Sequence, residues 1–366
     1  MEDIEEGQRS RFDWPLLLVI LLLVGMGLVN IYSATHGHGD GDFLTKQLIA
    51  LTVALVASLG VILLDYRIFD RVAYVLYGVN LFALALVPFL GVTRNGARRW
   101  IDLGAFNWQP SETMKIITIL ALAKFFQKRN QVKKMGLKDL VIPGLIAGVP
   151  ALMTISQPDL GTGGHILIVG VAILLFVGIR PKILIGACIL GIVSFPIFWQ
   201  YGLKAYQKDR IVTFINPMRD PRGEGYNAIQ SLIAVGSGEL TGKGYQKGTQ
   251  TQLEFTPEGH TDFIFTVLAE EWGLIGAIVL FLLYVLMFYR MVGISSMASD
   301  TFGALLGVGI TALLASQIFI NIAMVCGMFP IVGIPLPLLS YGGTSLLTSM
   351  LGLALLMNVG FRRSIF

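Results

Sequence analysis

The sequence predicts an all-α polytopic membrane protein with about ten transmembrane helices and a large structured extracytoplasmic loop before the eighth span. Of the 366 residues, 54% are hydrophobic and 14% are charged, whereas a soluble domain carries about a quarter charged residues. The mean hydropathy is +0.72. Apolar runs of about 20 residues, the length that crosses a bilayer, recur along the chain. One long polar stretch, 202–261, interrupts them.

The apolar runs form a single transmembrane domain over residues 1–366. The first run follows "MEDIEEGQRSRFD" and lacks a small-residue cleavage site, so we expect a span and not a cleaved signal peptide. The ten expected spans lie near 15–33, 47–64, 72–91, 112–127, 140–156, 163–179, 182–201, 262–290, 302–327 and 343–361.

Basic residues set the expected orientation, because short cytoplasmic loops carry an excess of Lys and Arg. With a cytoplasmic N-terminus, the inner loops include "KFFQKRNQVKKMGLK", whereas the short outer loops hold few basic residues apart from "TRNGARRW". An even number of spans then places both termini in the cytoplasm. The sequence pI of about 9.0 fits basic loops that face anionic headgroups, and we expect no nucleic-acid partner.

Two outer segments are too polar and too long to serve only as connections. They are "TRNGARRWIDLGAFNWQPSETMK" and the loop 202–261. The second contains aromatic and apolar residues at spacings that allow short amphipathic helices. We therefore expect a structured layer on the outer membrane face.

The stretch "TPEGHTDFIFTVLAEEWG" places Asp262 where the eighth span begins. Two interpretations are open. Thr261 could cap a helix with Asp262 in its first turn, where a carboxylate favours the positive end of the helix dipole. Alternatively, Asp262 is functional, since Glu254, Glu258 and His260 gather at the same helix mouth and one cap needs only one acceptor.

Glu270 and Glu271 lie deeper in the same apolar run. Acids inside a membrane span are costly and commonly functional. A structural role is equally open, with a buried Arg or Lys as partner, but the sequence does not name that partner.

"NWQPSETMK" places Glu112 three residues before Lys115 at the start of the fourth span. This spacing predicts an ion pair on one helix face. The pair could be an ordinary surface pair, or it could hold a cation at the outer mouth for an anionic headgroup, together with Arg98 and Arg99. Asp159, after the helix-breaking Pro158, ends another span and could equally be a helix-terminal acid.

Two further motifs are weak. "HGHGDGD" (residues 36–42) has metal-ligand residue types on a flexible glycine-rich loop, so a metal remains unknown. "GELTGKGYQKGTQ" fails the phosphate-loop pattern, because Lys243 is followed by Gly244 and not by Ser or Thr.

Four stretches together resemble the SEDS family (shape, elongation, division and sporulation) across nearly the whole chain. They are "WQPSETMK", "QPDLGTG", "GTQTQLEFTPEGHTDFIFTVLAEEWG" and "FPIVGIPLPLLSYGGTS". Within the family, "GTQTQLEF" ahead of "HTDFIF" is more like the RodA proteins of cell elongation than the FtsW proteins of division.

The resemblance implies a cytoplasmic (inner) membrane glycosyltransferase that polymerises lipid II into glycan strands on the outer face during elongation and rod-shape maintenance. The family's essential aspartate falls on Asp262, which would act as general base. Its polar cavity residues fall on Glu112, Lys115, Asp159 and Arg210. Further candidate substrate-binding residues are Arg99, Lys243 and His260.

The resemblance also implies partners: lipid II, a class B penicillin-binding protein transpeptidase and other membrane proteins of the elongation complex. No cofactor is certain, and a divalent cation (Mg²⁺ or Mn²⁺) is left open. Two other functions stay open: a transporter that flips lipid II, and a scaffold for a penicillin-binding protein without activity of its own.

Overall fold

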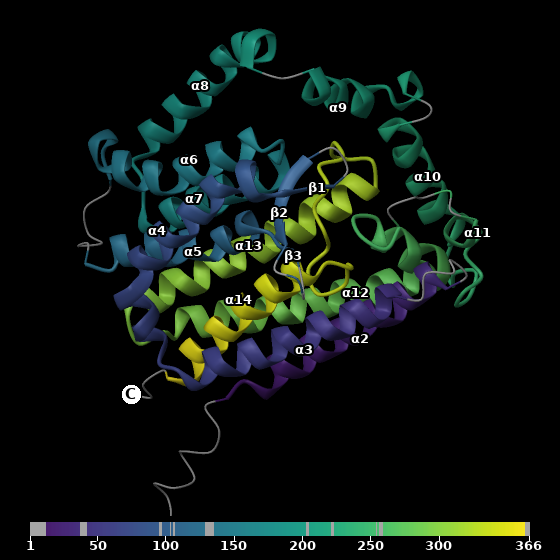
Figure 1. Cartoon of the computed structure of the whole chain (residues 1–366), viewed down its shortest axis with the longest axis horizontal. Helices are drawn as coiled ribbons and strands as arrows, with labels where there is room; N and C mark the ends of the chain where they lie inside the picture. The colour runs from purple at the N-terminus through teal and green to yellow at the C-terminus, as the bar shows by residue number, and fades with distance from the viewer. Residues whose placement is uncertain are drawn as a thin grey trace, which may run out of the picture.

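The structure is a computed structural model of the whole chain. It describes residues 12–36, 42–94, 97–102, 104, 107–128, 135–202, 205–220, 223–253, 255 and 259–362. Its helices form one bundle, with a small sheet and several short helices at one end (Figure 1).

Each of the ten expected apolar runs coincides with a helix, which confirms the all-α class. The bounds are α2 Trp14–Thr35, α3 Asp42–Leu63, α4 Tyr66–Leu90, α5 Pro110–Phe126, α6 Val141–Ser156, α7 Leu160–Val177, α8 Pro181–Ile197, α12 Ile264–Ser296, α13 Thr301–Val325 and α14 Gly343–Phe361. Among the described residues, eight helices are long and apolar enough to cross a membrane. The helices α5 and α8 have 17 residues each.

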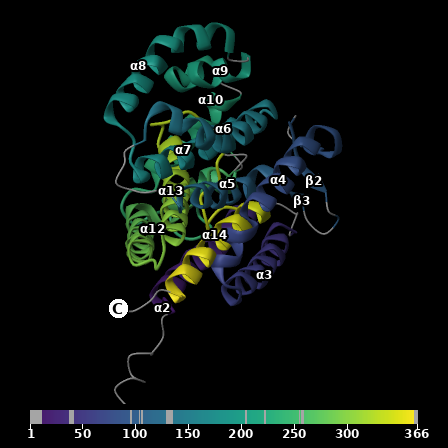
Figure 2. The same cartoon turned by 90° about the vertical axis from the view of Figure 1, so that its left-hand side faces the viewer.

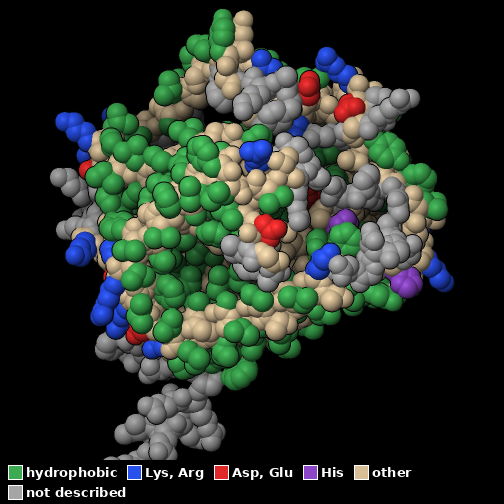
Figure 3. Space-filling model, viewed as in Figure 1, with side chains coloured by type: hydrophobic (Ala, Val, Ile, Leu, Met, Phe, Trp, Pro, Cys, Tyr) green, Lys and Arg blue, Asp and Glu red, His purple; other side chains and the backbone are tan. Residues whose placement is uncertain are grey.

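The core of the bundle forms around α13, which packs against α5, α7, α12 and α14. The helix α14 also packs against α3, and α12 against α2. Outer helices turn many apolar side chains outward, and Figure 3 shows hydrophobic side chains over most of one face of the bundle. In a membrane protein these outward faces meet lipid.

The segment between α4 and α5 forms a three-stranded antiparallel sheet in the order β1-β2-β3. The strands are β1 Val92–Arg94, β2 Ala97–Asp102 and β3 Asn107–Trp108. Sequence analysis expected a functional outer segment here without naming strands. In the sequence, Asn95–Gly96 is a strong hairpin signal and could have predicted that the residues on either side of it pair as strands.

The segment 202–261 contains three short α-helices, α9 Ala205–Ile215, α10 Glu224–Ser237 and α11 Thr249–Gln252. Two shorter turns accompany them: a π-helical turn Phe198–Gly202 and a 3₁₀ turn Pro217–Arg219. The helix α10 packs on α12, while α8 and α9 lie at the margin of the bundle above α6 and α7 (Figure 2). The expectation of a structured segment before the eighth span is therefore confirmed.

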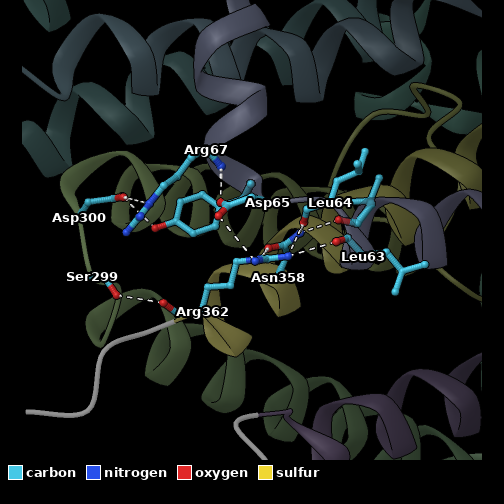
Figure 4. A network of polar contacts seen from close by, with 10 residues as sticks. Leu63, Leu64, Asp65, Arg67, Ser299, Asp300, Asn358 and Arg362 are labelled. Atoms are coloured by element: carbon cyan, nitrogen blue, oxygen red, sulfur yellow. Dashed lines mark hydrogen bonds and ion pairs between the residues drawn. The ribbon is translucent and has the colours of Figure 1, made fainter.

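The other end of the bundle is tied by a polar network (Figure 4). The Asn358 side chain donates to the main-chain oxygens of Val61 and Leu64. Arg362 lies 3.6 Å from Asp65, and Ser299 donates to the main-chain oxygen of Arg362.

The N-terminal end of α2 lies at this same end. Asp13, which caps α2, pairs with Arg290 near the C-terminal end of α12 at 2.7 Å. The last turns of α12 therefore contact the start of the first described helix, and the α12–α13 turn contacts the end of the last one. Both described termini of the bundle lie on one side, as an even number of crossings requires.

Candidate functional site

The loop 326–342, between α13 and α14, organises the opposite end of the bundle. We call it the α13–α14 loop. It contacts the segment that carries Asp262 and also contacts the start of α7. It forms part of the wall of the pocket beside α9. Several residues predicted from distant parts of the sequence therefore lie around one loop.

Asp262 is half-buried in the turn just before α12. The Asn321 amide, near the end of α13, donates to the main-chain oxygens of Asp262 at 2.8 Å and Ile334 at 2.6 Å. A Cβ added at Gly333 would lie 3.2 Å from the Asp262 Oδ2 atom, so the carboxylate packs against the α13–α14 loop. Asn321 thus fixes the main chain of Asp262 relative to this loop.

The helix-cap interpretation of this region is wrong. The helix α12 begins at Ile264, and its N-cap residue, Phe263, makes no side-chain cap hydrogen bond. Its first turn contains no acidic residue. Neither Thr261 nor Asp262 therefore has the role that a capped helix start would give it.

Asp159 caps α7, as the helix-terminal interpretation expected. Its carboxylate also binds a side chain at the start of another helix. One oxygen accepts from the Thr162 amide at 3.1 Å, and the other accepts from the Gln109 side chain at 3.0 Å. The cap thereby links the start of α7 to the start of α5. Nearby, the Arg99 guanidinium donates to the main-chain oxygen of Pro158 and joins β2 to the same turn.

Gly161 connects this turn to the α13–α14 loop. A Cβ there would lie 2.8 Å from the main-chain oxygen of Val332 and 3.0 Å from the Ile334 side chain. Only a glycine permits this close approach. The starts of α5 and α7 and the loop beside Asp262 are thus packed into one unit.

Glu112 and Lys115 form the expected ion pair at 2.8 Å, but not at the surface. Their side chains are 6% and 2% exposed, so the interpretation as an ordinary surface pair is wrong. The Glu112 Oε2 atom is buried and has no hydrogen-bond partner among the described residues. A buried pair with an unused acceptor is costly unless other groups complete it, which favours a functional role.

Arg210 lies on α9 and lines a small, partly open pocket of about 60 Å³. The rest of its wall comes from α9, α10, the end of α13 and the α13–α14 loop: Thr213, Phe214, Pro217, Ala228, Leu232, Met324, Gly327, Phe329 and Ile331. One cation thus stands among mainly apolar side chains, beside the loop that also meets Asp262.

His260 lies in an aromatic cluster. Its ring centroid is 4.7 Å from that of Phe43 and 5.7 Å from that of Tyr341. The main-chain oxygen of His260 also accepts from the Tyr341 amide at 2.9 Å. The cluster anchors the segment before Asp262 to α3 and to the end of the α13–α14 loop.

Lys243 is held elsewhere. Its ammonium pairs with the Glu270 carboxylate at 2.8 Å, and the Glu270 side chain is fully buried. Lys243 is thus the partner that the sequence did not identify for Glu270. Glu271 accepts instead from the Ser33 hydroxyl of α2 at 2.5 Å.

Within the described residues, no three His, Cys, Asp or Glu side chains gather in a way that could hold a metal ion. Glu254 and Glu258 of the expected acidic cluster lie outside the described residues, as do residues 37–41 of "HGHGDGD". The structure therefore brings Asp262, Asp159, Arg99, Arg210 and His260 to one loop region. It buries Glu112 and Lys115, which both lie in the first two turns of α5.

Sequence analysis missed three residues that position this site: Gln109, Asn321 and Gly333. Asn321 could have been found, because an amide inside an apolar span commonly has a structural or functional partner. Gln109 and Gly333 have no such signal, since their partners are far away in the sequence.

The chain is similar to known proteins over nearly its whole length. The profile of the FtsW/RodA/SpoVE family of cell cycle proteins matches residues 13–364. The chain is 38% identical to the peptidoglycan glycosyltransferase MrdB of Escherichia coli, covering 97% of this chain and 95% of that protein. It is 36% identical to stage V sporulation protein E of Bacillus subtilis, covering 95% and 96%.

Two solved structures share the fold. One contains a chain of a peptidoglycan synthase complex that coordinates polymerization and crosslinking. The identity is 32% and the TM-score 0.83, with 97% of this chain and 99% of that chain covered. The other is the crystal structure of the rod shape determining protein RodA of Thermus thermophilus, with 28% identity, a TM-score of 0.73 and coverage of 98% and 100%.

Proposed function

This chain belongs to the FtsW/RodA/SpoVE family, and on that premise we propose how its site carries out polymerisation of glycan strands. The protein is a multi-pass membrane peptidoglycan glycosyltransferase of the elongation type. Its substrate in our proposal is lipid II, a disaccharide peptide carried on a polyprenyl pyrophosphate.

The observation that carries the proposed mechanism is the position of Asp262. Its carboxylate lies against Gly333 at one end of the bundle, and the loop that holds it also lines the pocket of Arg210. A lipid-anchored substrate would present its sugar here while its tail stays in the membrane. Both reacting groups of two lipid-linked sugars could thus meet one carboxylate.

Glycan extension forms a bond from a sugar hydroxyl oxygen to an anomeric carbon and breaks the bond from that carbon to the pyrophosphate. In our proposal the Asp262 carboxylate takes the hydroxyl proton as the new bond forms. The electron pair of the broken bond leaves on the pyrophosphate, which is already a good leaving group. No second carboxylate is needed as an acid, in contrast to the paired carboxylates of glycosidases.

Cations must stabilise the departing pyrophosphate. Arg210 lines the partly open pocket, and Arg99 lies at the turn that Asp159 caps. Lys115 has three donors, and Glu112 accepts from one of them. We propose that Arg210 and Arg99 contact the substrate, while the Lys115 ammonium, held by Glu112, offers its remaining donors.

If a divalent cation takes part, the substrate pyrophosphate would supply most of its ligands, since no three His, Cys, Asp or Glu side chains gather among the described residues, and the Asp262 carboxylate would remain the base. Such a cation would help to neutralise the leaving group. The role of the protein is then to orient the carboxylate.

We further propose that both termini are cytoplasmic and that the candidate site faces the outside. The basic loops at the other end support this orientation, and Figure 3 has a row of Lys and Arg along the edge near the C-terminus. A class B penicillin-binding protein would be the cross-linking partner. The similarity to a chain of a complex that couples polymerization and crosslinking supports that partner.

The test is polymerisation by the purified protein in detergent, where no membrane sides exist. We expect glycan polymer from lipid II without any other protein. A transporter or an inactive scaffold would form none under these conditions, and that result would overturn the proposed reaction.

A further inference from the structure

The helix α12 is broken at Gly273, where φ is 62° and ψ is −159°. The break separates a short segment, residues 264–272, from the long remainder of the helix. Nine residues span about 13 Å, and Asp262 lies directly before this short segment. The position of the carboxylate therefore depends on what holds the two ends of the short segment.

Residues 238–251 fill the break, and we call them the splint. The main-chain oxygens of Glu270 and Glu271 accept from the amides of Lys243 and Gly244, both at 3.0 Å. Without these donors the two carbonyls at the end of the short segment would lack partners. The splint therefore ends the short segment by direct main-chain contact.

The other side of the break is bonded in the same way. The amides of Leu274 and Ile275 donate to the main-chain oxygens of Glu239 and Leu240, at 2.9 and 3.1 Å. A Cβ at Gly242 would lie 2.1 Å from the Glu271 oxygen, so the approach requires glycine. The splint thus replaces the helical hydrogen bonds that Gly273 interrupts.

The Glu270 side chain binds several residues of the splint beside the helix break. It is fully buried, and its two oxygens accept five hydrogen bonds from four splint residues. The donors are the Lys243 ammonium, the amides of Gln250 and Thr251, and the hydroxyls of Thr249 and Thr251. Lys243 balances the charge, so this carboxylate is complete without a substrate.

The adjacent Glu271 offers a natural comparison. It is also buried, but its carboxylate accepts from the Ser33 hydroxyl on α2, and its contact with the splint is to the main chain of Gln246. These two neighbouring buried carboxylates thus have different hydrogen-bond partners. Glu270 accepts five hydrogen bonds from the splint, so its side chain is the more extensive attachment of the short segment to the splint.

We propose that Glu270 is a positioning residue for polymerisation. By binding the splint, it fixes the position of the short segment along its helix axis and its rotation about that axis. The position of the Asp262 carboxylate against Gly333 follows from both. This inference rests on the proposed role of Asp262. A shift of about 1 Å in a reacting group can lower a rate about 100-fold, so loss of this anchor should reduce turnover more than substrate binding.

The test compares Glu270→Gln with Glu271→Gln, its matched control. Glutamine has one acceptor oxygen and places an NH₂ group against donors, so Glu270→Gln removes several of the splint bonds. Glu271→Gln keeps an oxygen for Ser33. Initial rates across a lipid II titration, well below the melting temperature of each variant, give kcat and KM separately.

We expect Glu270→Gln to lower kcat by about 10- to 100-fold with KM within about twofold. Glu271→Gln should keep kcat within about threefold of the wild type. Adding Glu270→Gln to Asp262→Asn should lower the residual rate no further, because residues that act as a unit are not additive. A purely structural role predicts a lower melting temperature with unchanged kcat in the folded protein.

A folded Glu270→Gln variant with wild-type kcat would overturn the inference, as would an equal loss in Glu271→Gln. If Glu270→Gln does not fold, Thr251→Val is the second variant, because it removes one donor to Glu270 and keeps the ion pair with Lys243. Thr251→Val should lower kcat by about 3- to 10-fold. A wild-type kcat in this variant would also overturn the inference. A wild-type protein without polymerase activity overturns the proposed function itself. If Asp262→Asn polymerises lipid II at the wild-type rate, Asp262 is not the general base. The proposed positioning role of Glu270 is then overturned as well.

Discussion

Gly333 packs against the Asp262 carboxylate: a Cβ at residue 333 would lie 3.2 Å from Oδ2, and φ at this glycine is +68°. Gly333→Ala should therefore displace the carboxylate. It should also strain the backbone at residue 333, which costs about 1–2 kcal/mol. We predict at least about a tenfold loss of polymerisation rate, because the general base is displaced.

Gly178→Ala is the matched control for backbone strain. Its φ is +98°, but a Cβ there would meet nothing within 4 Å. Gly178 follows α7 at the end away from Asp159, so this variant should lose stability and keep its rate. Equal rate losses in both variants would mean that backbone strain, and not contact with Asp262, controls activity.

The second prediction concerns the buried pair of Glu112 and Lys115. Lys115→Ala leaves a carboxylate buried without its partner, which costs about 3–5 kcal/mol of stability. We expect both a lower melting temperature and a lower polymerisation rate. Thermal melts and initial rates on the same preparation measure the two effects.

The double variant Glu112→Gln with Lys115→Met separates charge from folding. It removes both buried charges and keeps side chains of similar size, so it should recover most of the stability. Its rate should stay low, because the ammonium donors of Lys115 are gone. Recovery of the rate together with stability would show that the pair is only structural.

The third prediction lies at the other end of the bundle. Asn358→Leu removes the donors to the carbonyls of Val61 and Leu64, which should cost about 1–3 kcal/mol. Residue 358 lies 15 residues beyond the start of α14, about 22 Å along the helix. We therefore expect a lower melting temperature and an unchanged kcat; a large fall in kcat would mean that the two ends of the bundle are coupled.

Hydropathy located the helices well, because each apolar run has the length that a bilayer or a helix-rich core requires. It could not find the break at Gly273. The break depends on a backbone conformation and on the approach of residues 238–251, and neither leaves a trace in an apolar run. The helix α8 has 17 residues where the expected run 182–201 has 20, because a π-helical turn, Phe198–Gly202, follows it.

Part of the site followed from sequence spacing. The three-residue spacing of Glu112 and Lys115 predicted their ion pair, but not its burial, which is set by α4, α7, α13 and α14 packing against α5. The partner of Glu270 could not be predicted, because Lys243 reaches it from a separate segment. The cap expected from Thr261 was wrong, since the turn before α12 continues to Phe263.

The role of Asp262 is the central claim, and Asp262→Asn tests it most directly. The substitution keeps the size of the side chain and removes the proton acceptor. Because Phe263 and not Asp262 is the N-cap residue of α12, and because asparagine keeps a hydrogen-bonding side chain of the same size, the melting temperature should stay close to the wild-type value. Catalysis by a positioned base contributes about 10²–10⁴-fold.

The measurement is the initial rate of glycan polymer formation from lipid II by wild type, Asp262→Asn and Asp262→Glu, across a Mg²⁺ and Mn²⁺ titration, with thermal melts as the folding control. We predict that Asp262→Asn loses at least about 100-fold at every metal concentration and that Asp262→Glu is intermediate. Partial rescue of the Asn variant by added metal would instead assign a metal-binding role to the carboxylate. A folded Asp262→Asn protein that polymerises lipid II at the wild-type rate would contradict the account.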